Sequence, residues 1–283
     1  MKLLRYGPKG LEKPGMLCRY GKIRDLSHII TDFGGETVSL RALDELHAID
    51  PERLPEVDGE QRIGACVIDA PNFFCVGLNY SKHAAESGAQ VPAEPILFSK
   101  ATSALNGPND AVVIPPGSTQ TDWECELGVV IGEPCAYVSE AEALKYVAGY
   151  CVINDISERH WQRDLGGQWI KGKSAPSFGP VGPWLVTADE IENPQALSLW
   201  LELNGERVQN SSTADMIFGV AEIISYMSRF MELRPGDIIA TGTPEGVGMG
   251  FDPQRYLSPG DRLRLSVEAL GEQNQSVVAH SSA

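Results

Sequence analysis

Positive charge is scarce in this sequence. Its 283 residues include 23 Lys and Arg against 38 Asp and Glu, which gives a formal net charge of −15. No basic stripe offsets this excess, so the composition argues against a nucleic-acid partner and against binding to anionic membrane surfaces. A cavity for an anionic substrate must therefore obtain its local positive charge from a metal ion or from a few placed Lys and Arg residues.

Paired cysteines and long apolar runs are also missing. The 6 cysteines form no CxxC pair and no zinc-like spacing, and most lie among Val, Ile and Leu, where a free thiol behaves as a small hydrophobe. This pattern predicts a cytoplasmic protein without disulfides. No stretch approaches the roughly 20 apolar residues of a membrane span, and the N-terminal MKLLRYGPKG lacks the apolar core of a signal peptide.

The segment TDWECELGVVIG, residues 121–132, has two distinct faces when it is read as a strand. Alternate residues from Trp123 to Ile131 form an apolar face, and Glu124 and Glu126 lie on the opposite face. Two ionised carboxylates so close together repel each other unless a cation lies between them. The alternative for an isolated ExE pattern is an edge strand with one solvated face.

Asp155 adds a third acidic group, because in CVINDISER it shares a strand face with Cys151 and Ile153. Taken alone, Asp155 could equally be the N-cap of the segment that follows. Three carboxylates without a neighbouring His or Cys favour a hard cation, with Mg²⁺ preferred and Mn²⁺ next. Zinc is disfavoured, since Cys125 belongs to the apolar face.

His83 and Glu86 are three residues apart, a spacing that places both side chains on one face of a helical turn. A carboxylate orients a neighbouring imidazole, as required for a general base that acts on water. The alternative is a surface histidine beside a chance glutamate. The flanking Gly88, Pro92 and Pro95 suggest a loop able to order over a ligand.

Residues 1–65 are expected to form a small N-terminal domain of short strands with a helix near residues 40–49, followed by a catalytic domain over residues 66–283. Helices are expected over residues 140–150, with Ser139 as N-cap, and around residues 216–233. Asn204-Gly205 predicts a hairpin turn, and the last ten or so residues are expected to be frayed. Lys171 and Lys173 lack a phosphate-loop spacing and by default would be solvated.

Taken together, six segments in order closely resemble the fumarylacetoacetate hydrolase family, over about residues 73–269. They are GLNYSKHAAE, DWECELGVVIG, GYCVINDISER, WIKGKS, NGERVQ and TGTPEGVG. The resemblance implies an α+β, mainly β fold, a mixed β-roll or distorted β-sandwich with peripheral helices, usually in a homodimer or higher oligomer. It also implies Mg²⁺ or Mn²⁺ held by Glu124, Glu126 and Asp155.

The resemblance further implies catalytic roles for Lys173 and for His83 and Glu86, which it places on a mobile lid, and substrate contacts from Arg159, Gln162 and Thr243. Tyr80, an aromatic residue near this lid, is added to the substrate-binding candidates. The expected reaction is hydrolysis of the C–C bond of a 2,4-diketo acid, a 2-oxo acid substrate, to pyruvate and a carboxylic acid. Oxaloacetate decarboxylation and keto–enol or double-bond isomerisation are alternatives within the family. Outside it, the acidic pair of a glycosidase and a metal-stabilised binding domain are alternatives.

The substrate is expected to carry hydroxyl groups, because the N-terminal segment and NGERVQNSSTADMIFG resemble relatives that act on 2,4-diketo-3-deoxy sugar acids, such as L-rhamnonate or L-fuconate derivatives that would yield lactate. Arg159, Gln162 and residues 174–177 are candidates to bind those hydroxyls. Near the lid only Tyr80 and Trp161 stand out as aromatic residues, so an aromatic-lined pocket for a larger hydrophobic acyl group is not expected. Pro176 replaces an Asp that many relatives carry, which alters the expected pocket wall beside Lys173.

Overall fold

A ten-stranded sheet forms the centre of the molecule in the computed structural model, which describes residues 1–281. Strands β9 (Cys125–Ile131) and β10 (Val147–Asn154) are antiparallel neighbours in the middle of this sheet, and Glu126 is paired with Ile153. The strand order is β3 (Ile23–Asp25), β2 (Lys13–Leu17), β1 (Lys2–Tyr6), β12 (Gly179–Thr187), β10 (Val147–Asn154), β9 (Cys125–Ile131), β15 (Ile238–Ala240), β4 (Phe73–Gly77) and β5 (Ile96–Lys100), with β6 (Leu105–Asn106) beside β12.

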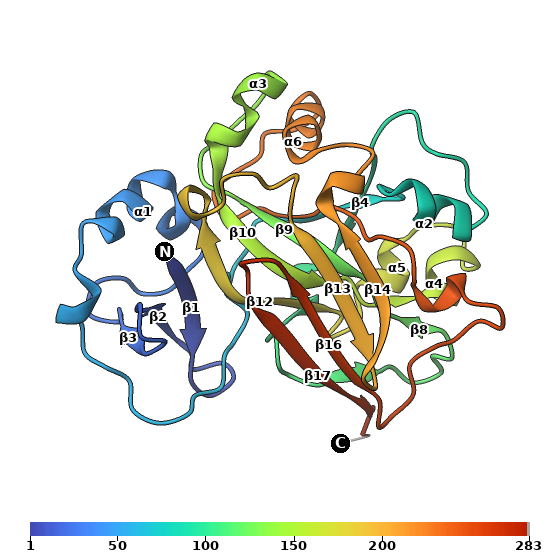
Figure 1. Cartoon of the computed structure of the whole chain (residues 1–283), viewed down its shortest axis with the longest axis horizontal. Helices are drawn as coiled ribbons and strands as arrows, with labels where there is room; N and C mark the ends of the chain where they lie inside the picture. The colour runs from blue at the N-terminus through green and yellow to red at the C-terminus, as the bar shows by residue number, and fades with distance from the viewer. Residues whose placement is uncertain (282–283) are drawn as a thin grey trace.

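A second, five-stranded sheet packs against one face of this central sheet (Figure 1). Leu127, Val129 and Ile131 of β9 share one buried core with leucines of β13 and β16. The second sheet runs in the order β14 (Glu206–Ser212), β13 (Ser198–Leu203), β16 (Arg262–Val267), β17 (Glu272–Ala279) and β7 (Val112–Ile114). The mainly β, α+β sandwich expected from the sequence is therefore confirmed.

The two faces of β9 are as the alternation predicts. Val130 belongs to the core on the opposite face of the central sheet. On that same face, a Cβ at Gly128 would lie 2.6 Å from Cδ1 of Ile153. Glycine therefore allows the β10 side chains to pack directly over β9. The strand is interrupted at residues 123–124, so Asp122 belongs to a separate short strand, β8 (Thr121–Asp122), paired with β11 (Ser157–Glu158).

The helices are short and lie at the periphery. Figure 1 shows α2, α4 and α5 on the side of the molecule away from α1 and the N-terminal strands. None of the helices within residues 1–281 is long and apolar enough to cross a membrane. Their bounds are α1 Leu40–His47, α2 Ser81–Glu86, α3 Glu140–Ala143, α4 Arg159–Arg163, α5 Ile170–Lys173 and α6 Val220–Ser228.

Several local predictions are confirmed and others are wrong. The helix expected over residues 140–150 ends at Ala143, and residues 147–150 belong to β10. Asn204 and Gly205 form the β13–β14 turn, both with positive φ, and Ser139 is the N-cap of α3, although its side chain accepts no capping hydrogen bond. The expectation of a frayed C-terminus is wrong for residues 274–279, because β17 continues to Ala279 and pairs with both β16 and β7; residues 282–283 lie outside the described residues. Strand β1 joins the central sheet through β12, and the division at residue 65 stays a prediction.

Candidate functional site

Three buried carboxylates meet where β9 and β10 lie side by side. Glu124, Glu126 and Asp155 each offer an oxygen atom within 4.8 Å of the other two. Glu124 immediately precedes β9, Glu126 lies within it, and Asp155 immediately follows β10. The antiparallel register thus brings together residues about thirty positions apart in the sequence. The N-cap alternative for Asp155 is wrong, since Glu158 caps α4 through the backbone N–H of Trp161.

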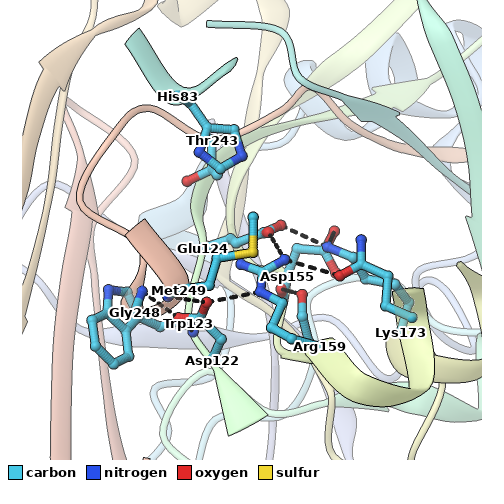
Figure 2. A network of polar contacts seen from close by, with 12 residues as sticks. His83, Asp122, Trp123, Glu124, Asp155, Arg159, Lys173, Thr243, Gly248 and Met249 are labelled. Atoms are coloured by element: carbon cyan, nitrogen blue, oxygen red, sulfur yellow. Dashed lines mark hydrogen bonds and ion pairs between the residues drawn. The ribbon is translucent and has the colours of Figure 1, made fainter. Parts of the chain in front are cut away.

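Three cationic side chains surround these carboxylates, as Figure 2 shows for Lys173 and Arg159. Lys173 Nζ lies 2.7 Å from Glu124 Oε2 and 2.8 Å from Asp155 Oδ2. Arg159 Nη1 lies 2.7 Å from Glu124 Oε1, and Lys100 pairs with Asp155 Oδ1. The default expectation of a solvated Lys173 is therefore wrong, because this side chain is buried, whereas Lys171 is exposed.

The neighbouring charges affect the acids differently. Burial alone would raise the pKa of Glu124, but the positive charges of Lys173 and Arg159 outweigh it and lower that pKa. Burial, together with the charges of Asp155 and Glu124, raises the pKa of Glu126 well above its ordinary value. Burial lowers the pKa of Lys100, and the charge of Asp155 opposes that shift.

Glu126 provides the test of whether a metal ion fits here. It is 2% exposed, accepts a hydrogen bond of 2.7 Å from the Gly242 N–H, and forms no ion pair within residues 1–281. A buried carboxylate beside two others is costly unless a cation or proton compensates it. The all-oxygen donor set fits Mg²⁺ or Mn²⁺, and Cys125 lies in the core on the other face.

His83 and Glu86 form the predicted pair on α2. His83 Nδ1 lies 2.8 Å from Glu86 Oε1, and Glu86 Oε2 accepts a hydrogen bond of 2.9 Å from the Gly246 N–H. Glu86 is thus anchored to the loop after β15, and it fixes the orientation of the buried imidazole. The other ring nitrogen, Nε2, remains available for a water molecule or a substrate.

One cavity of about 280 Å³ is lined by Glu124, Glu126 and His83, and Asp155 is not among its lining residues. The cavity is also lined by Arg159, Gln162, Lys173 and Thr243. Glu86 is not a lining residue and acts through its contact with His83 Nδ1. Tyr80 and Trp161 are not among the lining side chains. Tyr80 is fully buried, and its hydroxyl has no hydrogen-bond partner within residues 1–281.

The structure corrects the expected cavity walls. Ser174 and Ser177 do not line the cavity, because their hydroxyls accept hydrogen bonds from the backbone N–H groups of residues 101 and 113. Pro176 does not line it either. An aromatic wall is present after all: Phe98 and Trp169 line the cavity with ring centroids 5.0 Å apart. Trp169 crosses so close to β4 that a Cβ at Gly77 would lie 2.4 Å from its ring.

Lys100 is the charged residue that the sequence reasoning missed. It ends β5 two residues after Phe98, so the two share a strand face, but nothing in the sequence indicates that this face meets the carboxylates. Its ammonium group also donates a 3.0 Å hydrogen bond to the carbonyl oxygen of Ile156. Lys100 therefore supports the residues immediately after β10, including Asp155.

We expect Lys100→Met to lower the free energy of unfolding by about 3–5 kcal/mol, because it leaves the buried Asp155 with one cation fewer. Urea unfolding in the presence of a chelator measures this effect without compensation by an added cation. Lys145→Met is the matched control, since Lys145 is exposed on the surface beside Glu142 and should change stability by well under 1 kcal/mol. Equal stability of the two variants would contradict a supporting role for Lys100.

Comparison with known proteins identifies the family. The family model described as "Fumarylacetoacetate (FAA) hydrolase C-terminal" matches residues 72–278, which include every site residue described above. The chain belongs to the fumarylacetoacetate hydrolase family. A Burkholderia multivorans relative with a provisional hydrolase name is 58% identical, over 97% of this chain and 98% of its own.

Solved structures of the family share the whole fold. Fumarylacetoacetate hydrolase from Exiguobacterium antarcticum is 33% identical with a TM-score of 0.89, covering 99% of this chain and 100% of its own. Maleylpyruvate hydrolase from Sphingobium, solved with manganese(II) and pyruvate, is 28% identical with a TM-score of 0.79, covering 99% and 100%. A 2-hydroxyhepta-2,4-diene-1,7-dioate isomerase from Mycobacterium marinum is 31% identical with a TM-score of 0.74, covering 100% of both chains. Family membership thus includes both hydrolases and isomerases.

Proposed function

We propose that this protein is a Mg²⁺- or Mn²⁺-dependent hydrolase that cleaves the C3–C4 bond of a 2,4-diketo acid to pyruvate and a carboxylic acid. The observation that carries the proposal is that Glu124 and Glu126 of the carboxylate cluster line the same cavity as His83, whose ring is held by Glu86. A cation site alone would suit binding, and a histidine alone would suit many reactions. Their combination supports addition of water to a carbonyl carbon beside a bound 2-oxo acid.

The residues of the chain divide the reaction between them. A bound divalent ion would supply positive charge that polarises the C2 carbonyl group and stabilises the leaving pyruvate enolate. His83 Nε2, with its ring held by Glu86, takes a proton from the water that attacks C4. The C3–C4 bond then breaks, its electron pair stays with C3, and the proton held by His83 returns to C3 to give pyruvate.

Two cations hold the 2-oxo acid end of the substrate. Lys173 Nζ, between Glu124 and Asp155, adds positive charge beside the departing enolate. Arg159 Nη2 is buried at the cavity without a hydrogen-bond partner within residues 1–281, so it is free to bind the substrate carboxylate. The pyruvate and manganese in the Sphingobium hydrolase support this assignment of substrate class and cofactor.

A small, hydroxylated acyl group is the proposed specificity. The volume of about 280 Å³ is at the small end of ligand pockets, which suits a six-carbon sugar-derived acid such as 5-hydroxy-2,4-dioxohexanoate, whose products are pyruvate and lactate. The Phe98–Trp169 wall supplies a flat surface for the conjugated enol form of such a diketo acid. We infer a cytoplasmic enzyme from its free, buried cysteines, and a homodimer or higher oligomer from the family resemblance.

Isomerisation is the second candidate, because solved isomerases share this fold. In that reaction His83 would move a proton along the substrate without adding water. Oxaloacetate decarboxylation would use the cation and Lys173 in the same way, again without attack by water.

A substrate panel tests the proposal. We expect the kcat/KM for 5-hydroxy-2,4-dioxohexanoate to exceed those for acetylpyruvate and fumarylacetoacetate by about tenfold or more, because a site built for a hydroxyl discriminates against analogues that lack it. Pyruvate release is measured by chromatography, since lactate is itself a product. Oxaloacetate as the best substrate would identify a decarboxylase, and conversion of 2-hydroxyhepta-2,4-diene-1,7-dioate without pyruvate release would identify an isomerase.

A further inference from the structure

Ser87 presents an unpartnered hydroxyl group at the cavity. It follows α2 directly, and its backbone N–H donates a 3.1 Å hydrogen bond to the carbonyl oxygen of His83, so it continues the turn that carries His83. Its Oγ atom is buried and has no hydrogen-bond partner in the described chain, residues 1–281. Ser87 lines the same cavity as His83.

A buried hydroxyl without a partner costs free energy, so its position at a ligand cavity indicates a polar group of the ligand. Only two side chains that line the cavity have such an unpartnered buried atom within residues 1–281, Ser87 and Arg159. The Thr243 hydroxyl, in contrast, bonds the Cys125 carbonyl oxygen and Gln209. Arg159 lies at the carboxylate cluster, whereas Ser87 lies on the segment of His83.

The helical register fixes what Ser87 can reach. Residues His83 and Ser87 are four apart on one helical turn, which places their Cβ atoms roughly 5–6 Å from each other. If His83 activates the water that attacks C4, the substituent on C4 extends past His83 on the side away from the cation site. A group on C5 then lies within reach of the Ser87 hydroxyl, and the neighbouring cavity residues Leu78 and Ala89 offer no side-chain polar atom that competes for it.

We propose that Ser87 is a specificity-determining residue that hydrogen-bonds a hydroxyl group on the carbon next to C4 of the substrate. This inference rests on the proposed function and adds to it the residue that selects a 5-hydroxylated acid over a plain acylpyruvate. Ser87 acts on substrate choice alone: it is not required to activate water or to hold the 2-oxo acid end.

The test compares two substrates that differ only in that hydroxyl, 5-hydroxy-2,4-dioxohexanoate and 2,4-dioxohexanoate, with Mn²⁺-loaded enzyme. Ser87→Ala should lower kcat/KM for the hydroxylated acid by about 10–100-fold and leave kcat/KM for 2,4-dioxohexanoate within about twofold. Ser87→Thr, which keeps a hydroxyl, should retain more of the preference than Ser87→Ala. Ser81→Ala, at the exposed start of the same helix, is the matched control and should change neither value.

The possible outcomes separate this inference from the proposed function. Equal losses on both substrates, or no loss on either, would overturn the role of Ser87 while the hydrolase assignment stands. Wild-type enzyme that releases pyruvate from neither acid would overturn the proposed function, and the specificity role with it. Wild-type enzyme that turns over both acids equally well would overturn the role of Ser87 and the proposed preference for a hydroxylated acid, while the hydrolase assignment stands.

Discussion

Glu126→Ala is expected to reduce turnover of every 2,4-diketo acid to background and to abolish binding of Mg²⁺ and Mn²⁺. Glu126 is the one member of the carboxylate cluster that forms no ion pair within residues 1–281, so a bound cation depends on it most directly. Without metal the variant should be at least as stable as wild type, because removing a buried, unpaired carboxylate relieves repulsion from Glu124 and Asp155. Calorimetric titration with each metal, steady-state kinetics and urea unfolding in chelator measure the three effects.

A matched control and a chelation experiment complete this test. Glu192→Ala removes an exposed carboxylate outside the cluster and should leave metal binding and turnover unchanged. Wild-type enzyme should lose activity in chelator and regain it when Mg²⁺ or Mn²⁺ is added. Full activity of either the chelated enzyme or Glu126→Ala would rule out the metal-dependent mechanism.

His83→Ala is expected to lower kcat by about 10²–10⁴-fold, the usual contribution of a general base. The variant should still bind the metal and oxalate, an analogue of the pyruvate enolate, because His83 lies on α2 and the carboxylates lie on the central strands. Pre-steady-state pyruvate release and calorimetric titration with oxalate measure the two effects separately.

His160→Ala provides the control for this experiment. His160 is an exposed histidine paired with Asp164 at the surface, and its loss should leave kcat unchanged. If His83→Ala loses oxalate affinity by the same factor as it loses rate, His83 binds the ligand and is not the base.

The sequence predicts those parts of the site that depend on local periodicity. The two-residue repeat places Glu124 and Glu126 on the face opposite the apolar core, and the i, i+3 spacing brings His83 to Glu86. Each pattern lies within a single element, so it can be recognised in the sequence before the fold is known. The order of six short motifs adds the family, and with it the metal-ligand role expected for Asp155 and the catalytic role expected for Lys173.

Residues that reach the site through long-range packing cannot be predicted from local sequence patterns. Lys100 arrives on β5, and Trp169 arrives on the segment before α5, where it crosses Gly77. Neither residue lies in a pattern that indicates which neighbours it will meet. The terminal strand β17 was missed for a related reason: its buried positions include Gln273 and Gln275, so it has no apolar alternation. Their amide groups donate to backbone carbonyls of residues 108, 152 and 182, contacts that depend on the completed fold.

The distribution of the site over two kinds of element has an evolutionary consequence. The cation ligands are fixed by the register of β9 and β10 at the centre of the large sheet, where the neighbouring side chains are buried. Ser87 belongs to a peripheral turn after His83. Within the described residues, the backbone hydrogen bonds around Ser87 are made only to α2 and to the residues that end it. Cation binding therefore depends on the sheet, whereas the proposed selectivity depends on a peripheral segment in which a substitution should cost little stability. When members of such a family change their substrate, we would then expect substitutions first at the few positions after the histidine and last in the central strands.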